Sequence, residues 1–240
     1  MGAGRGNPAP PRQVRAMFDR VAPFYDLMNT LMTAGIDGRW RRAAIRAARL
    51  RRGDRALDVA CGTGMLTRAA AVVVGRDGAA VGIDASPRML EHARRAGVPT
   101  GAAVPKYIEA DALALPFGAA SFEATTIGFG LRNMPDYAAA LAEMARVAAP
   151  GGRVVVLEIA VPRAALARML FVTWFRRGVP LIGRLLRRGA AYAYLPESVL
   201  GYPSPERVAE LMAEAGLLDV RWRWLPTGMA TLHVGRRPAG

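Results

Sequence analysis

A glycine-bearing turn with two nearby acids has the residue types and spacing to bind a small molecule. The stretch from Ala56 to Gly64, ALDVACGTG, reads as a buried strand that runs into a Gly-x-Gly turn, and a helical pattern starts at Met65. Glycines let the backbone approach a ligand closely, and the following helix offers free N–H groups at its N-terminus. Asp58 lies within the strand, and Asp84 ends the next apolar stretch, AAVGID. The pattern indicates a cradle for a small ligand.

Details of this cradle narrow the class of ligand. The stretch 62–67 reads Gly-x-Gly-x-x-Thr, so it lacks the third glycine of a dinucleotide fingerprint, and no Gly-Lys-Ser/Thr is present to hold a triphosphate. An acid at Asp84 can accept both ribose hydroxyls of a nucleoside, and an acid before the turn, Asp58, suits a ligand with an ammonium or sulfonium group. With a third strand that ends at Asp111, the pattern resembles the S-adenosylmethionine cradle of Rossmann-like methyltransferases.

Composition and charge limit the class of protein. At 240 residues, with 52% apolar and 22% charged residues, the chain suits one globular α/β domain. The single cysteine, Cys61, excludes an intramolecular disulfide and fits a reducing cytoplasm. No apolar run reaches the roughly 18 residues of a membrane-spanning helix. The net charge of +14 favours an anionic partner such as a membrane surface; nucleic acid is not expected, since we find no zinc ligands or RNA-binding signature.

Alternating strand and helix patterns predict the elements that position the cradle. Strands are expected at 56–60, 79–84, 106–110, 122–129 and 153–160, with helices at 65–74, 87–96 and 137–149. Such alternation implies an α/β fold with a mostly parallel, doubly wound sheet. The resemblance to methyltransferases implies the Rossmann-like class I form of this fold, with seven strands. The sheet is expected to end in an antiparallel hairpin near 218–225 and 229–235. Ser86, Asp136 and Ser204 are expected to cap helices.

Ligands of such sheets lie at the carboxyl ends of the strands. Asp84, Asp111 and Gly128 all fall at predicted carboxyl ends, alongside the 61–64 turn. The sequence therefore brings the candidate binding residues to one edge of the sheet.

Segments outside the core are expected to form an arm and a lid within a single domain, 1–240. Residues 1–12 read as a disordered Gly/Pro tail without the apolar core of a signal peptide. A helical arm follows at 13–52, interrupted at Pro23 and with Asp37 as a helix cap. Residues 53–160 form the cofactor-binding core, and 161–203 hold short helical stretches, at 169–175 and 180–188, over the substrate. Residues 204–237 supply a last helix and the hairpin.

Four further stretches carry a more specific resemblance. They read MFDRVAPFYDLMNTLMTAGIDGRWRR (17–42), TIGFGLRNMPDYAAAL (126–141), RVAAPGGRVVVLE (146–158), and AYLPESVLGYPSPERVAELMAEAGL with ATLHVG (193–217, 230–235). With the cradle, they resemble the quinone C-methyltransferases, which methylate demethylmenaquinol or 2-methoxy-6-polyprenyl-1,4-benzoquinol. The menaquinone branch is favoured, because the ubiquinone branch tends to have a serine where Gly128 lies.

The resemblance implies S-adenosylmethionine as cofactor and a set of residues that hold it. Thr63 would contact the methionine end, Asp84 the ribose, and Asp111 with Ala112 the adenine edge. The resemblance adds Gly128, and the cradle itself adds Asp58, Gly62 and Gly64. The chain departs from many relatives at Met65, Ala149 and Ala160, of which the first could reshape the methionine pocket.

Arg132 and Asn133, just after the fourth strand, are the candidate catalytic residues. Methyl transfer to a ring carbon requires alignment with the donor and a group that accepts or stabilises the charge of the phenolic proton. Arg132 could stabilise a quinolate, and Asn133 could position a water that accepts the proton. The alternative is that both residues cap and brace the following helix.

The arm and the segment after strand five are candidates for contact with a polyprenylated quinol. Tyr25, Asp26 and Asn29 are predicted to bind substrate as part of a lid, while the Met/Phe stripe beside them is read as packing. Segment 164–190 mixes Met, Leu, Phe and Trp with Arg, which suits peripheral contact at the inner face of the cell membrane. A homodimer is compatible with the sequence. The rivals left open are ubiquinone-pathway methylation, another small-molecule methyltransferase, and a non-enzymatic basic protein that binds RNA or membrane.

Overall fold

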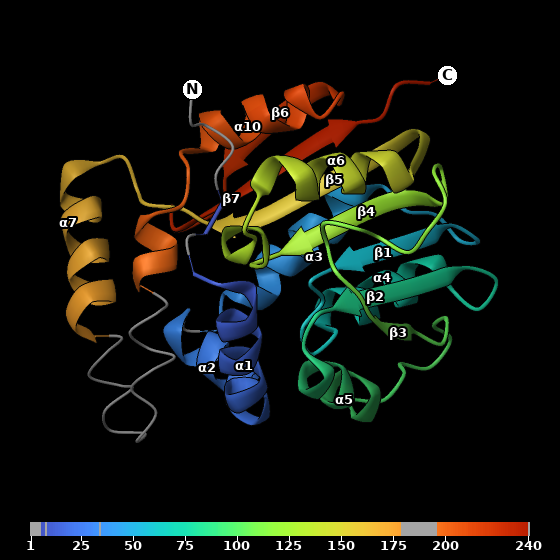
Figure 1. Ribbon diagram of the computed structural model, residues 1–240, viewed down its shortest axis with the longest axis horizontal. Coiled ribbons are helices and arrows are strands. Elements are labelled where there is room, and N and C mark those ends of the chain that lie inside the picture. Colours follow the sequence, from blue (N-terminus) through green and yellow to red (C-terminus); the bar gives the residue numbers. More distant parts are fainter. Residues whose placement is uncertain (1–5, 8, 34, 179–195, 240) are drawn as a thin grey trace.

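A seven-stranded sheet organises the protein, whose computed structural model describes residues 6–7, 9–33, 35–178 and 196–239 (Figure 1). The strand order is β3-β2-β1-β4-β5-β7-β6. The first five strands run parallel, and β7 is antiparallel to both its neighbours. The predicted fold class and final hairpin are confirmed. The strands are β1 (Arg55–Val59), β2 (Ala79–Asp84), β3 (Lys106–Glu109), β4 (Phe122–Gly128), β5 (Ala148–Ile159), β6 (Leu218–Trp224) and β7 (Ala230–Arg236).

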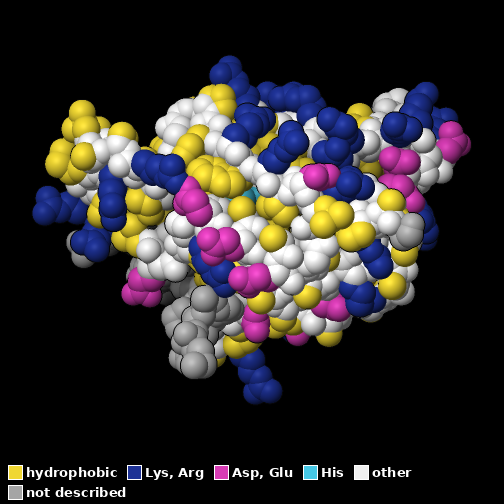
Figure 2. Space-filling view, turned by 90° about the horizontal axis from the view of Figure 1, so that it is seen from above, with side chains coloured by type: hydrophobic (Ala, Val, Ile, Leu, Met, Phe, Trp, Pro, Cys, Tyr) yellow, Lys and Arg dark blue, Asp and Glu magenta, His cyan; other side chains and the backbone are white. Residues whose placement is uncertain are grey.

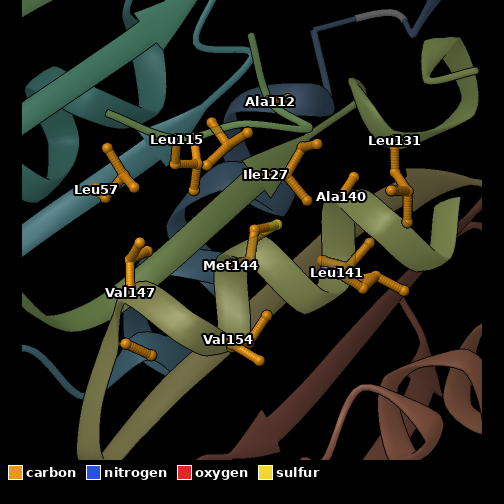
Figure 3. Packing of buried hydrophobic residues seen from close by; sticks show 14 of the residues in the cluster. Leu57, Ala112, Leu115, Ile127, Leu131, Ala140, Leu141, Met144, Val147 and Val154 are labelled. Atoms are coloured by element: carbon orange, nitrogen blue, oxygen red, sulfur yellow. The ribbon is translucent and has the colours of Figure 1, made fainter. Parts of the chain in front are cut away.

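Helices cover both faces of the sheet, which explains the nearly continuous apolar runs of its central strands. α3 (Asp37–Ala48) and α4 (Met65–Val74) pack on one face against a core that includes Ala56 and Val155. α6 (Tyr137–Val147) and α10 (Pro205–Glu214) pack on the other against Leu57 and Val154, as the close view shows (Figure 3). α5 (Pro87–Arg95) follows β2 and contacts β2 and β3.

Helix ends agree with the predicted caps at three positions and differ at two. Ser86, Asp136 and Ser204 each accept a hydrogen bond from the backbone N–H three residues on. Asp37 is not a cap: it lies inside the first turn of α3, where its carboxylate pairs with Arg41 at 3.4 Å. α6 ends at Val147 rather than 149, because position 149 precedes a proline and is driven to extended backbone that joins β5.

The N-terminal arm is longer than predicted. α1 (Pro11–Val21) begins within the stretch expected to be disordered, a 3₁₀ turn (Ala22–Phe24) contains Pro23, and α2 (Tyr25–Met32) follows. Before α1, the buried Asn7 donates to the carbonyl of Arg132 at 3.1 Å. The expectation of a disordered tail is therefore wrong for these residues, since backbone hydrogen bonds join Gly6 and Asn7 to the loop after β4. The arm lies beside the carboxyl ends of the strands (Figure 1).

The segment after β5 begins with α7 (Ala165–Thr173), which continues as a π-helical turn over Trp174–Gly178. The helical stretch expected at 180–188 lies outside the described residues. Residues 196–200 form a further helical turn. Within the described ranges, every helix is too short or too polar to cross a bilayer.

Candidate active site

A cavity of about 500 Å³ opens at the carboxyl ends of β1, β2 and β4, the size expected for a cofactor site. Loops after these strands form its floor and walls, and the arm roofs it through α1 and Tyr25. Several wall residues have left-handed backbone, with φ of 51° at Ala60, 55° at Gly62 and 61° at Phe129. Non-glycine residues rarely adopt this conformation, and it concentrates at functional sites. We call this space the donor cavity.

Asp84 connects the donor cavity to both loops that frame it. Its Oδ2 accepts from the backbone N–H of Gly62 and its Oδ1 from that of Ser86, each at 2.8 Å. Burial raises the pKa of Asp84, the two backbone hydrogen bonds oppose that effect, and the nearby Asp19 adds to it. Each carboxylate oxygen has a second lone pair, so the group can also accept hydroxyls from a ligand in the cavity.

Asp58 lies beneath the cradle turn rather than on the cavity wall. Thr67 of α4 donates to its Oδ2 at 2.7 Å and Thr126 of β4 to its Oδ1 at 3.0 Å. The side chain is buried, and burial raises its pKa from 3.8 to about 6 against the opposing hydrogen bonds. Any effect of Asp58 on a bound cation is therefore electrostatic and acts through the turn.

The raised pKa of Asp58 predicts a specific pH dependence. Between pH 4 and 6 the folded protein retains a proton on Asp58 that the unfolded chain has lost, so the free energy of unfolding falls as pH rises. An Asp58→Asn variant has no titrating carboxyl at this position, so its free energy of unfolding lacks this decrease with pH. Its amide can still form hydrogen bonds with both threonines. We expect the variant to gain about 2.4 kcal/mol relative to wild type between pH 4 and pH 7, measured by urea unfolding. A difference independent of pH would contradict the assignment.

The structure divides the predicted cofactor residues into two groups. Gly62, Asp84, Asp111 and Ala112 line the donor cavity. Gly64 and Gly128 lie behind the wall, where each leaves room for a side chain: a Cβ on Gly64 would lie 2.4 Å from the Tyr107 hydroxyl, and one on Gly128 2.4 Å from Leu66. The absence of a side chain at these two glycines therefore allows neighbouring side chains to pack closely against the backbone.

Thr63 joins the arm to the cradle. Its hydroxyl donates to Oδ1 of Asp26 at 2.6 Å, and Ser86 makes a matching bond to Asp19 at 2.6 Å. Two arm carboxylates thus hold the roof over the donor cavity. Asp19 was missed from the sequence, and Ser86 was recognised only as a helix cap, because neither residue carries a local signal of this long-range contact.

A second, smaller space adjoins the donor cavity, and Phe129 lines both. We call it the aromatic chamber; its walls come from α2, α3, β5 and α7 and include Trp40, Phe129, Phe171, Trp174 and Phe175. Its open volume is about 30 Å³, room for a water molecule. Asn29 lines it with a buried Nδ2 that finds no hydrogen-bond partner among the described residues. The Arg41 guanidinium lies 5.0 Å from the centre of the Phe129 ring.

Arg132 and Asn133 face different spaces. Arg132 lines the aromatic chamber; its Nη1 lies 2.6 Å from Oε1 of the fully buried Glu158 and donates to the carbonyl of Phe129. Asn133 lines the donor cavity, and its side chain also donates to the Phe129 carbonyl, at 3.4 Å. Glu158 was missed as a site residue, although an acid at the carboxyl end of a strand is the signal that identified Asp84.

The three arm residues predicted to bind substrate also lie in different places. Tyr25 lines the donor cavity and packs edge-on against Phe18, Asp26 binds Thr63, and Asn29 enters the aromatic chamber. The three residues therefore do not form one binding surface.

The donor cavity fits S-adenosylmethionine. Asp84 offers carboxylate oxygens at the wall, Gly62 brings backbone close to the space, and Ile83, Met89 and Ala112 supply apolar surface for an adenine ring. These are the groups that a nucleoside with a charged amino-acid tail requires.

Comparison with known proteins agrees with this geometry. A model of the ubiE/COQ5 methyltransferase family matches residues 8–237. A demethylmenaquinone methyltransferase from Thermus thermophilus is 46% identical, over 92% of this chain and 100% of that protein. One from Deinococcus radiodurans is 43% identical (92% and 91%), and a ubiquinone/menaquinone biosynthesis C-methyltransferase from Geobacter sulfurreducens is 40% identical (94% and 88%).

Solved structures support the fold alone. The [4+2]-cyclase SpnF superposes with a TM-score of 0.67 at 19% identity, covering 98% of this chain and 100% of that one. A SAM-dependent methyltransferase from Thermotoga maritima superposes with a TM-score of 0.65 at 18% identity, covering 93% and 99%. From the family match and the donor cavity together, the chain belongs to the ubiE/COQ5 methyltransferase family and is an S-adenosylmethionine-dependent methyltransferase.

Proposed function

We propose that this protein methylates a ring carbon of demethylmenaquinol to give menaquinol. The observation that carries the proposal is the pair of adjoining spaces: a donor cavity with the carboxylates of Asp84 and Asp111 at its wall, and an aromatic chamber that shares Phe129 with it. A donor nucleoside and an electron-rich ring can meet at this wall. The names of the relatives from Thermus thermophilus and Deinococcus radiodurans favour demethylmenaquinol as the acceptor.

The protein's contribution to the donor side is binding and orientation. When bound, S-adenosylmethionine supplies an electrophilic methyl group on a sulfonium sulfur. Asp84 would hold the ribose, Asp111 and Ala112 the adenine, and the backbone of Gly62 the tail. Because displacement at the methyl carbon requires alignment of donor and acceptor, positioning alone can supply about 7–11 kcal/mol of the barrier.

The acceptor side combines an apolar chamber with a few polar groups. Aromatic walls would stack on the quinol ring and exclude water, and Nδ2 of Asn29 would donate to a ring oxygen. Arg132 would stabilise the quinolate that forms as the phenolic proton leaves. Asn133, which lines the donor cavity, would position the water that accepts that proton from that side of Phe129. The chamber must widen to admit a ring, which requires side chains after β5, such as Trp174 of the π-helical turn, to move outward.

The test compares two acceptors. We expect purified enzyme to transfer labelled methyl from S-adenosylmethionine to a short-chain demethylmenaquinol faster than to a short-chain 2-methoxy-1,4-benzoquinol. Preferred methylation of the benzoquinol would assign the protein to the ubiquinone pathway, the alternative named by the relative from Geobacter sulfurreducens. Transfer to neither, with donor binding intact, would contradict both.

The outer face of α7 supports the proposal that the enzyme docks on a membrane to reach a polyprenylated acceptor. Phe171 and Phe175 point inward to the aromatic chamber, whereas Leu166, Met169 and Leu170 are 58–66% exposed. A helix of a soluble monomer normally turns polar residues outward. Arginines at 168, 176 and 177 accompany this apolar face and suit anionic headgroups. The chamber would then lie directly beneath the membrane contact.

Membrane docking predicts an effect of two leucines. We expect the double substitution Leu166→Gln and Leu170→Gln to weaken cosedimentation with phosphatidylglycerol vesicles by about tenfold or more, because each leucine contributes roughly 1–2 kcal/mol when it enters lipid. The matched control is Val72→Gln with Val104→Gln, which changes two exposed apolar residues elsewhere. Equal loss in both variants, or no binding by wild type, would contradict docking through α7.

Location and assembly remain predictions. We place the protein in the cytoplasm at the inner face of the cell membrane, where a polyprenylated quinol would be. A homodimer is a separate expectation, measured by analytical ultracentrifugation of the purified chain.

A further inference from the structure

A groove of about 770 Å³ lies away from the donor cavity, on the face of the sheet that carries α3. Six arginines line it: Arg46 from α3 and Arg49 directly after that helix, Arg153 from β5, Arg221 and Arg223 from β6, and Arg236 from β7. We call it the arginine groove. Among the described residues that line it, Asp219 is the single acid.

Strand geometry explains how these side chains converge. Arg221 pairs with Val234 and Arg223 with Leu232, so both arginines share the sheet face whose apolar residues pack toward α3. The intervening Trp222 points to the opposite face, where its ring stacks on His233. β6 is the edge strand and extends past α3, so the groove has sheet on one side and the end of a helix on the other.

The arrangement places like charges in direct register. Arg153 of β5 lies opposite Arg236 of β7, a cross-strand pair that destabilises a sheet unless another charge compensates it. Asp219 binds Arg236 at 3.0 Å, and among the described residues the Arg153 side chain donates a hydrogen bond only to the carbonyl of Ala47. Partial burial lowers the pKa of Arg153, and Arg49 and Arg236 add to the effect.

Several arginines elsewhere on the surface have carboxylate partners. Arg207 contacts Glu210 and Glu214, and Arg55 contacts Glu123, so these cations are neutralised locally. In the arginine groove the described part of the chain supplies one carboxylate for six guanidinium groups. Figure 2 shows Lys and Arg side chains crowded along one side of the face seen from above. Such concentration of charge favours an anion from outside the chain.

The shape and chemistry of the groove select among anions. Planar guanidinium groups match phosphate oxygens with paired hydrogen bonds. The groove is concave, which disfavours a flat bilayer, and its lining includes the aliphatic residues Ala47, Leu232 and Val234. Trp222 is the one aromatic residue among the described residues that line the groove, and its ring stacks on His233 on the opposite face of the sheet, so its flat face is not open to a nucleobase in the groove. A compact ligand with several adjacent negative charges fits best.

We propose that the arginine groove is a binding site for a diphosphate group, recognised by Arg221 and Arg223 from the edge strand with Arg49 and Arg153 opposite them. The site is separate from the donor cavity, because Arg153 begins the regular part of β5 whereas the donor cavity opens at the carboxyl ends of the strands. Binding there does not require the methyl donor.

The experiment titrates the full chain with pyrophosphate in a calorimeter, with saturating S-adenosylhomocysteine present to keep the donor cavity filled. We expect saturable binding at one site, weakened by added NaCl, and at least about tenfold tighter than binding of orthophosphate, since two linked phosphates engage more guanidinium groups. The double variant Arg221→Gln and Arg223→Gln should lose about tenfold or more in affinity.

The matched control removes the same charge elsewhere. Arg76→Gln with Arg95→Gln changes two exposed arginines outside the groove and should bind pyrophosphate like wild type. Melting temperatures of both variants show whether they fold. Absence of saturation by pyrophosphate, equal loss in the control, or groove-dependent binding of phosphatidylglycerol vesicles or a single-stranded oligonucleotide in its place would overturn the proposal.

Discussion

Replacing Asp84 with alanine is expected to raise the dissociation constant for S-adenosylmethionine by about 100-fold or more. The carboxylate offers acceptors for two ribose hydroxyls, and hydrogen bonds to a charged group contribute about 1.5–3 kcal/mol each. The same carboxylate holds the backbone of Gly62 and Ser86, so its removal also loosens the loops that frame the donor cavity. Isothermal titration of the purified variant measures the loss directly.

Two further variants separate binding from general damage. Asp84→Asn keeps one acceptor oxygen and should lie between wild type and alanine. Asp77→Ala removes a carboxylate from an exposed turn after α4 and should bind the donor normally. If Asp84→Ala bound S-adenosylmethionine within threefold of wild type while folded, the donor cavity would not be the donor site.

Replacing Arg132 with methionine is expected to lower the free energy of unfolding by about 3–5 kcal/mol. The physical reason is the partner left behind: Glu158 is 0% exposed, and without Arg132 its charge is buried without a counterion. The variant also removes a donor to the Phe129 carbonyl, which shapes the wall between the two spaces. Urea unfolding with linear extrapolation measures the change.

Removing both charges tests this explanation. The double variant Arg132→Met with Glu158→Leu should recover much of the loss, because no isolated charge remains. Arg55→Met breaks the ion pair with Glu123, which is much more exposed, and should cost about 1 kcal/mol or less. A cost for Arg132→Met no larger than that for Arg55→Met would show that the buried pair does not stabilise the fold.

The same variants bear on the catalytic proposal for Arg132. If the side chain only supports the wall, the double variant should recover activity as it recovers stability. If Arg132 stabilises a quinolate, the double variant should stay impaired in kcat at a temperature where it is folded. The Glu158 partner makes this distinction necessary, since a neutralised guanidinium is a weaker source of positive potential.

Periodicity and turn chemistry account for what the sequence predicted well. Apolar runs separated by helical patterns lead to a parallel sheet, and the caps at Ser86 and Asp136 depend on hydrogen bonds within three residues. Acids at strand ends, Asp84 and Asp111, reach the donor cavity because parallel strands share one carboxyl edge. These features follow from local rules.

Local rules could not predict which residues lie behind the cavity wall. Spacing placed Asp58, Thr63 and Gly64 next to the turn, but the side on which each side chain lies depends on Thr126, Asp26 and Tyr107, which come from distant parts of the chain. Asn7 is buried for a similar reason: the loop after β4 supplies its partners.

The sequence by itself determined the order of elements, the edge of the sheet at which the donor cavity opens, and the family, because each depends on the spacing of residues close together in the chain. Only the tertiary structure decided that Arg132 is paired with Glu158, that Phe129 separates two spaces, and that six arginines meet in one groove. Those outcomes depend on contacts between residues far apart in the chain, which form only when the sheet and its helices pack.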